Sequence, residues 1–110
     1  MEYEAIIILK EVKNVNKNID KLISDIKEVV KIGNMQDEGA KNLPYALKHY
    51  NVGHWLMFRF ESAEENAQKV SEIMQNNKNI LKFIVALVEN KKFIKIAYKG
   101  GLIHGLESNF

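Results

Sequence analysis

Two stretches of this chain carry apolar residues at the 3.6-residue spacing of a helix, and β-branched or aromatic runs flank both of them. The first stretch runs from Asn18 to Gly33, where the glycine is placed to end a helix. The second begins at Ser62, which forms a capping-box pattern with Glu65, and closes at Asn79. The remaining runs are predicted strands, the second of them weak, and cover residues 3–10, 34–42, 52–61 and 80–88.

The resulting order is strand, helix, strand, strand, helix, strand, which predicts a ferredoxin-like α+β fold, βαββαβ. In that fold a four-stranded antiparallel sheet carries both helices on one face. A length of 110 residues with 46% apolar composition suits one domain, which buries roughly 60 to 65% of its unfolded surface. We place this domain at residues 1–90 and expect a basic C-terminal extension, or tail, at residues 91–110.

The face of the sheet without helices is expected to be apolar. If Ala5, Ile7 and Leu9 point towards the helices, strand alternation places Ile6 and Ile8 on the other side. In the aromatic strand, the residues expected in the core are Leu56, Phe58 and Phe60. Because large apolar groups left in water usually mark a partner, the expected protein-partner surface is Ile6, Ile8, Trp55 and Met57. Alternatively, the tail folds back and covers this surface through Phe93, Ile94, Ile96 or Tyr98.

Positive charge is concentrated in the tail. The net charge is only +2, yet residues 90–110 hold four lysines against one glutamate. A cationic tail on a nearly neutral body is typical of local phosphate contact, although a solvated tail has the same composition. With the basic residues around the connection between the second and third strands, the candidate RNA-binding residues are Lys41, Lys48, His49, Lys91, Lys92, Lys95 and Lys99.

No pattern in the chain predicts catalysis, a metal site or a cofactor. The absence of cysteine excludes disulfides, thiol catalysis and cysteine-based zinc sites. The three histidines, His49, His54 and His104, lack the spacing of a metal-ligand set. The adjacent Asp37 and Glu38 would point apart in a strand, so we expect solvated charges.

The ends of the chain and its apolar runs exclude further classes. Leu102 follows Lys99-Gly-Gly where a phosphate-binding loop would need other residues. No apolar run approaches the roughly 20 residues of a membrane helix, and the N-terminus opens with acidic residues instead of a basic, apolar signal. We therefore expect no enzyme, no cofactor, no small-molecule substrate and no membrane span.

The order and spacing of several loose motifs support a family resemblance. The chain opens with Tyr3-Glu4 before an aliphatic strand, and Gly39 is followed by Leu43 and Tyr45. The aromatic strand His54–Glu61 then continues the pattern without a gap. Over residues 2–90 the chain resembles the small-subunit ribosomal protein S6 family, bacterial and mitochondrial. The resemblance implies a structural constituent of the small ribosomal subunit that binds small-subunit rRNA, usually as a pair with ribosomal protein S18.

This chain departs from the bacterial pattern of the family at three places. Glu38-Gly39-Ala40-Lys41 stands where bacterial members often carry Trp-Gly-Arg-Arg, which leaves Lys41 as the basic residue of the motif. Leu43-Pro44-Tyr45 is more similar to mitochondrial members, so a mitochondrial matrix is slightly favoured over a bacterial cytoplasm. The segment between Gly33 and Gly39 is short, so the edge strand that meets the protein partner is expected to be truncated.

Two other functions remain open on the residues alone. The first is an oligomeric ferredoxin-like binding or regulatory domain that pairs through its open sheet face and binds no RNA. The second is a small enzyme on the same scaffold, which would need acid, base and nucleophile groups that do not cluster here.

Overall fold

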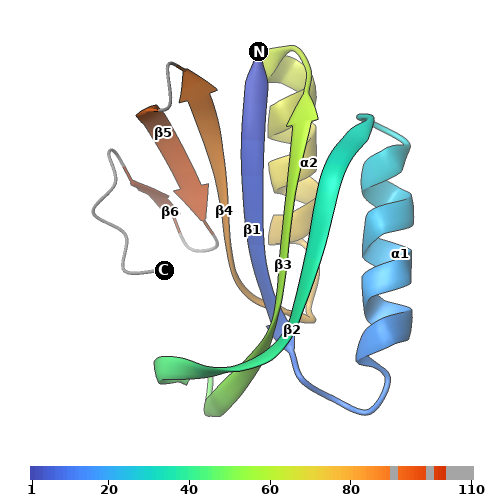
Figure 1. Cartoon of the computed structure of the whole chain (residues 1–110), viewed down its shortest axis with the longest axis vertical. Coiled ribbons are helices and arrows are strands. Elements are labelled where there is room, and N and C mark those ends of the chain that lie inside the picture. Colours follow the sequence, from blue (N-terminus) through green and yellow to red (C-terminus); the bar gives the residue numbers. More distant parts are fainter. Residues whose placement is uncertain (90–91, 99–100, 104–110) are drawn as a thin grey trace.

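The computed structural model describes residues 1–89, 92–98 and 101–103 (Figure 1). Eight elements follow one another along the chain. They are β1 (Glu2–Lys10), α1 (Val15–Lys27), β2 (Ile32–Leu47), β3 (Tyr50–Glu61), α2 (Glu64–Gln75), β4 (Ile80–Glu89), β5 (Lys92–Tyr98) and β6 (Gly101–Ile103). Neither α1 nor α2 is long and apolar enough to cross a membrane.

The first four strands and the two helices form the predicted ferredoxin-like fold. The strands lie side by side in the order β2-β3-β1-β4, and each neighbouring pair is antiparallel. Both helices lie on one side of this sheet, and α2 is seen behind β1 and β3 in Figure 1. The predicted order βαββαβ is therefore confirmed.

The core lies between the helices and the sheet, and it follows the predicted alternation. Ala5, Ile7 and Leu9 of β1 are fully buried against it. On β3 the buried core residues are Leu56, Phe58 and Phe60, as expected. From α1 and α2 the buried apolar stripes are Val15, Ile19, Leu22, Ile23, Ile26, Ala67, Val70 and Met74. Each large side chain removed from water here contributes about 1.5 to 3 kcal/mol, which is why the helices cover this face so closely.

Two predicted helix ends are wrong. Helix α1 ends at Lys27 with Glu28 as its C-cap, and Gly33 lies in β2 instead. A Cβ at Gly33 would lie 3.1 Å from the carbonyl oxygen of Arg59, so glycine allows β2 to approach β3 there. At the second helix the N-cap is Ala63, and Ser62 Oγ donates to the Ala63 carbonyl oxygen instead of capping a backbone N–H.

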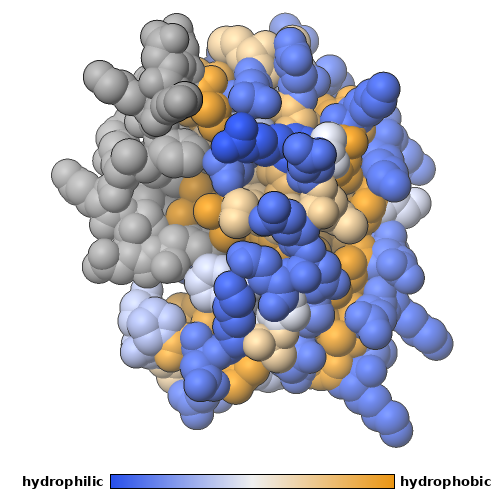
Figure 2. Space-filling model, in the orientation of Figure 1, coloured by the Kyte–Doolittle hydropathy of each residue, from blue (hydrophilic) through white to orange (hydrophobic). Residues whose placement is uncertain are grey.

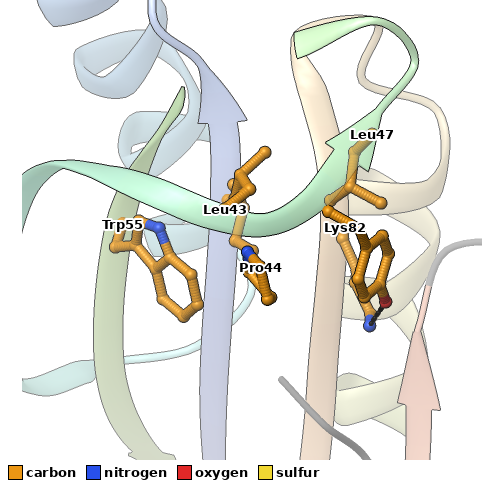
Figure 3. A pocket seen from close by; sticks show the side chains of 7 residues that line it. Leu43, Pro44, Leu47, Trp55 and Lys82 are labelled. Carbon is orange, nitrogen blue, oxygen red and sulfur yellow. Dashed lines mark hydrogen bonds between the residues drawn. The ribbon is translucent and has the colours of Figure 1, made fainter. Parts of the chain in front are cut away.

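Strand β2 is long, not truncated as expected from the short segment after Gly33. It has 16 residues, and its pairing with β3 shifts register at three places. These irregularities bend the strand pair, so that the far part of the β2–β3 hairpin, residues 40–53, turns across the sheet (Figures 1 and 3). We call residues 40–53 the arm, and the sheet face that it crosses, opposite the helices, the front.

The described part of the tail extends the sheet. Strand β5 pairs antiparallel with β4, and β6 pairs with β5, so the full order is β2-β3-β1-β4-β5-β6. The alternative in which the tail covers the front does not hold for this backbone, because it continues the sheet edge. The side chains of Phe93, Ile94, Ile96 and Tyr98 lie outside the described residues. The division into a domain at 1–90 and a tail at 91–110 stays a prediction.

Candidate nucleic-acid interface

The arm is seated on the front by one close contact between strands. Gly53 of β3 is buried and pairs with Lys10 of β1. A Cβ at this position would collide with Cγ2 of Ile8 and would lie 3.3 Å from Cδ2 of Leu43. Because glycine leaves this space free, Leu43 of the arm can approach Ile8, which is only 2% exposed.

Apolar side chains of the arm close over the sheet at this point. In Figure 3, β2 crosses in front of β3 and β1 and carries Leu43, Pro44 and Leu47 over this part of the sheet. Together with side chains from β1, β3 and β4, the space is lined by Ile8, Leu43, Pro44, Tyr45, Leu47, Trp55 and Lys82. It amounts to about 10 Å³, no more than one water molecule requires. The seat of the arm is therefore a packed contact and not a ligand pocket.

Three lysines stand over three aromatic rings around this seat. Lys10 Nζ lies 5.9 Å from the centre of the Tyr50 ring, and Lys41 Nζ lies 5.7 Å from that of Trp55. On the other side, Lys82 Nζ lies 6.0 Å from the centre of the Tyr45 ring and donates a hydrogen bond of 3.4 Å to the Tyr45 hydroxyl. We call these six residues the lysine–aromatic surface.

The predicted RNA-binding residue Lys41 takes part in this surface. Its ammonium group donates to Glu38 Oε2 at 3.0 Å, and its side chain is 48% exposed. An exposed pair of this kind contributes little, at most about 1 kcal/mol, so the ammonium group can exchange its partner. Glu38, expected to be a solvated charge, thus lies in an exposed pair with Lys41.

The predicted residues Lys48 and His49 form the tip of the arm. They are the two central residues of the turn that joins Leu47 to Tyr50, and both side chains are exposed. Both have left-handed backbones, with φ of 49° and 72°. Such two-residue hairpin turns strongly prefer Asn-Gly or Asp-Gly, because left-handed conformations are costly for other residues. A lysine and a histidine held in this turn are a strained pair on an exposed tip.

The four predicted tail lysines are described only in part. Lys92 and Lys95 belong to the backbone of β5, while Lys91 and Lys99 lie outside the described residues. Side-chain positions are not described for any of the four. The structure therefore places Lys41 at the base of the arm and Lys48 and His49 at its tip, and RNA contact by these residues and by the tail lysines stays a prediction.

The predicted partner surface is only partly open. Ile6, Trp55 and Met57 are half-buried on the front, whereas Ile8 lies under the arm. In Figure 2, apolar groups on this side appear as separate patches between hydrophilic side chains. The apolar front open to another protein is therefore narrower than the sequence predicts, and the arm of the chain itself provides the cover.

A hydrogen-bonded bridge at the base of the arm is not predicted by the sequence. His54 is 7% exposed, and its Nδ1 lies 3.0 Å from Glu11 Oε2 while its Nε2 lies 2.6 Å from Asp37 Oδ1. Asp37, expected to be a solvated charge, stays 46% exposed but also accepts this contact from His54. The three residues are far apart in the chain, so no local pattern could reveal them. Within the described ranges, no group of three or more His, Cys, Asp or Glu side chains could hold a metal ion.

Comparison with known proteins identifies the family. The sequence-family model for ribosomal protein S6 matches residues 2–86 of this chain. The chain belongs to the ribosomal protein S6 family. Similar relatives include the small ribosomal subunit protein bS6 of Rickettsia bellii, 25% identical over 80% of this chain and 77% of that protein. The protein of the same name from Helicobacter pylori is 29% identical over 84% of this chain and 68% of its own length.

A solved structure agrees with the fold. The crystal structure of 30S ribosomal protein S6 from Thermotoga maritima superposes with a TM-score of 0.66 and 19% identity, covering 76% of this chain and 83% of that one. S6 proteins are structural and not enzymatic, as the sequence predicts for this chain. The relatives named here are bacterial, so the preference for a mitochondrial ribosome gains no support and stays a prediction based on Leu43-Pro44-Tyr45.

Proposed function

We propose that this S6-family protein is a structural constituent of the small ribosomal subunit that binds small-subunit rRNA beside an S18-type protein. The family match over residues 2–86 is the observation that carries the proposal. The exposed basic tip of the arm supports the RNA part of it, because lysine and protonated histidine contribute to affinity by releasing counterions from phosphates.

The backbone of the tip supports a functional role for Lys48 and His49. Strained conformations of residues other than glycine persist where the surrounding structure holds them, and they gather at functional sites. Here the pairing of Leu47 with Tyr50 holds both residues in left-handed conformations. Asparagine and glycine would fit this turn better but would remove the basic groups. In the proposal, Lys41, Lys48 and His49 contact phosphates, and the tail lysines Lys91, Lys92, Lys95 and Lys99 add further contacts.

The front supplies the proposed contact with the neighbouring protein. Ile6, Met57 and Trp55 are half-buried and lie on the two central strands of the front. A second chain that covered them would bury apolar area at the rate of about 25 cal/mol per Å². Ile8 adds to this contact only if the arm moves, because the arm already covers it.

Co-sedimentation tests the proposed function. The full chain is mixed with small ribosomal subunits stripped of their S6 protein and is centrifuged at physiological salt. We expect the chain to sediment with the subunits, and we expect the bound fraction to fall steeply as salt is added. A chain that stays in the supernatant, or a discrete homodimer free of nucleic acid, would contradict the proposal and favour the oligomeric binding domain.

Paired variants separate phosphate contact from general charge. The double variant Lys48→Gln with His49→Gln removes the basic groups of the tip. The control Lys17→Gln with Lys21→Gln removes at least as much positive charge, from exposed lysines of α1 on the opposite side of the sheet. Co-sedimentation of the tip variant should become weaker and less dependent on salt than that of the control.

A further inference from the structure

We propose that the lysine–aromatic surface binds unpaired nucleotides of RNA, with bases stacked on its rings and phosphates beside its lysines. The proposal rests on the proposed function and deepens it. Lys10, Lys82, Tyr45 and Tyr50 do not belong to the RNA-binding set predicted from the sequence. The inference therefore defines a second contact area, next to the tip of the arm.

Four of the six residues, Lys10, Lys41, Trp55 and Lys82, share the front because of the sheet register. Lys10 is opposite Gly53, which is opposite Lys41, so both lysines lie in one row across three strands. In the neighbouring row, Ile8 is opposite both Trp55 and Lys82. Paired residues of an antiparallel sheet point to the same side, and strands are about 4.8 Å apart. The three ammonium groups and Trp55 therefore lie within a few strand spacings on the front, and the Tyr50 and Tyr45 rings join them through their contacts with Lys10 and Lys82.

The pairing of each lysine with a ring points to a single-stranded nucleic acid. Base and phosphate are neighbours in every nucleotide, so a ring with an ammonium group beside it can contact both. In a duplex the faces of the bases are already stacked, and only phosphates and groove edges would remain available. An acidic peptide would satisfy the lysines but would offer nothing flat for three rings. An unpaired nucleotide can stack its base on the ring and place its phosphate beside the ammonium group, as in other single-strand sites.

The exposure and the support of the surface fit this role. The Tyr45 ring is 53% exposed, and its hydroxyl accepts a hydrogen bond from Lys82, which restricts its movement. The seat of the arm, formed by Gly53, Ile8 and Leu43, fixes β2 across the sheet and so holds the rings at their lysines. A surface ordered before binding loses less conformational entropy when it binds.

Binding of a labelled oligouridylate and of an RNA duplex of equal length to the full chain tests the proposal by fluorescence anisotropy. The surface variant carries Lys10→Gln, Lys41→Gln and Lys82→Gln. The matched control carries the same change of charge on the helix side, at Lys17, Lys21 and Lys69. At salt concentrations between about 50 and 200 mM, we expect the surface variant to bind oligouridylate at least about tenfold more weakly than the parent. The slope of its log affinity against log salt should be smaller in magnitude by about 2. The control should change less than twofold.

The rings are tested separately from the charges. Tyr45→Leu should weaken oligouridylate binding about fivefold or more, because a stacked base is lost while every charge stays. Tyr45→Phe keeps the ring and should bind nearly as the parent does. Equal affinity of the parent for single strand and duplex, or no loss with Tyr45→Leu, would overturn the stacking site.

The outcomes distinguish this inference from the proposed function. If the surface variant still binds oligouridylate as the control does, the inference fails, even when the chain sediments with small subunits. If the parent chain does not sediment with subunits but binds oligouridylate through this surface, the ribosomal assignment fails and the site stands. A parent chain that binds neither RNA overturns the site as well. Circular dichroism shows whether each variant is folded before it is compared.

Discussion

The back and the front of the sheet are covered in different ways. On the back, α1 and α2 place continuous apolar stripes on Ile7, Leu9 and Phe58, and the contact is buried throughout. On the front, the cover is the arm, a bent extension of β2 and β3. It buries Ile8 but leaves lysines, rings and a strained turn around its edge.

The difference separates stability from recognition. A helix stripe that faces the core excludes polar groups, because a buried polar group without a partner is costly. The arm covers only a small part of the front, so charged groups keep contact with water at its rim. We infer that the back provides most of the folding free energy and that the front presents the binding groups.

The largest expected effect is the difference in stability cost between alanine substitutions at two neighbouring residues of β3 that point to opposite faces. Phe58→Ala should lower the free energy of unfolding by about 3 to 5 kcal/mol, because it leaves a cavity in the core. Met57→Ala on the front should cost about 1 kcal/mol, since its side chain is only half-buried. Urea denaturation of both variants measures the two values. Equal costs would mean that the front is packed as closely as the back.

Gly53→Ala tests the seat of the arm. The added methyl group would collide with Ile8, so we expect a loss of about 1 to 3 kcal/mol in the free energy of unfolding. Ile8→Ala removes the colliding methyl group. The loss of unfolding free energy in the double variant should therefore be smaller than the sum of the losses in the two single variants. A double-mutant cycle from urea denaturation measures this coupling. Strictly additive losses would show that the arm is not seated on Ile8.

The strained tip offers a change that should increase stability and reduce binding. Replacing Lys48 by Asn and His49 by Gly supplies the residues that this turn prefers, so the free energy of unfolding should rise by about 1 to 2 kcal/mol. Affinity for small-subunit rRNA should fall, because two basic groups are lost. Thermal unfolding and filter binding measure the two effects. The control pair Lys48→Gln and His49→Gln should lose binding without the gain in stability.

The smallest effect concerns pH and the back of the sheet. Burial, and to a lesser extent the charge of Glu64, raises the pKa of Tyr3 above its ordinary value of 10.0. The contribution of the neutral phenol to stability is complete below pH 10 and is lost as the pH rises through the higher folded-state pKa. Tyr3→Phe should therefore be less sensitive than the parent to alkaline unfolding above pH 10. An unchanged alkaline profile in Tyr3→Phe would contradict this.

Most of the fold could be predicted from the sequence because its signals are local. The periods of the two helices and the β-branched runs of β1, β3 and β4 each lie within one segment, so the order βαββαβ followed directly. The helix ends were less accurate. Glycine commonly ends helices, so the sequence predicts a C-cap at Gly33, whereas its role here is to let β2 approach the backbone of Arg59. That contact joins residues far apart in the chain.

The candidate site could be predicted only in part, for the same reason. Lys41, Lys48 and His49 are predicted to contact RNA because they flank a strand connection; the structure places them on the arm, and their contact with RNA stays a prediction. The partners of the lysine–aromatic surface come from β1, β2, β3 and β4, and His54 meets Glu11 and Asp37 across 43 and 17 positions of sequence. No short segment of the sequence contains all the residues of the lysine–aromatic surface, or all three residues of the His54 bridge.

The amino-acid sequence by itself determined the fold class, the helix-covered core and the family pattern, because apolar periodicity and short motifs are properties of single segments. Only the tertiary structure decided what covers the front. The bend of β2 depends on register shifts against β3 and on the space that Gly53 leaves beside Ile8. Those contacts exist only when three strands are paired, and they bring the lysines over their rings.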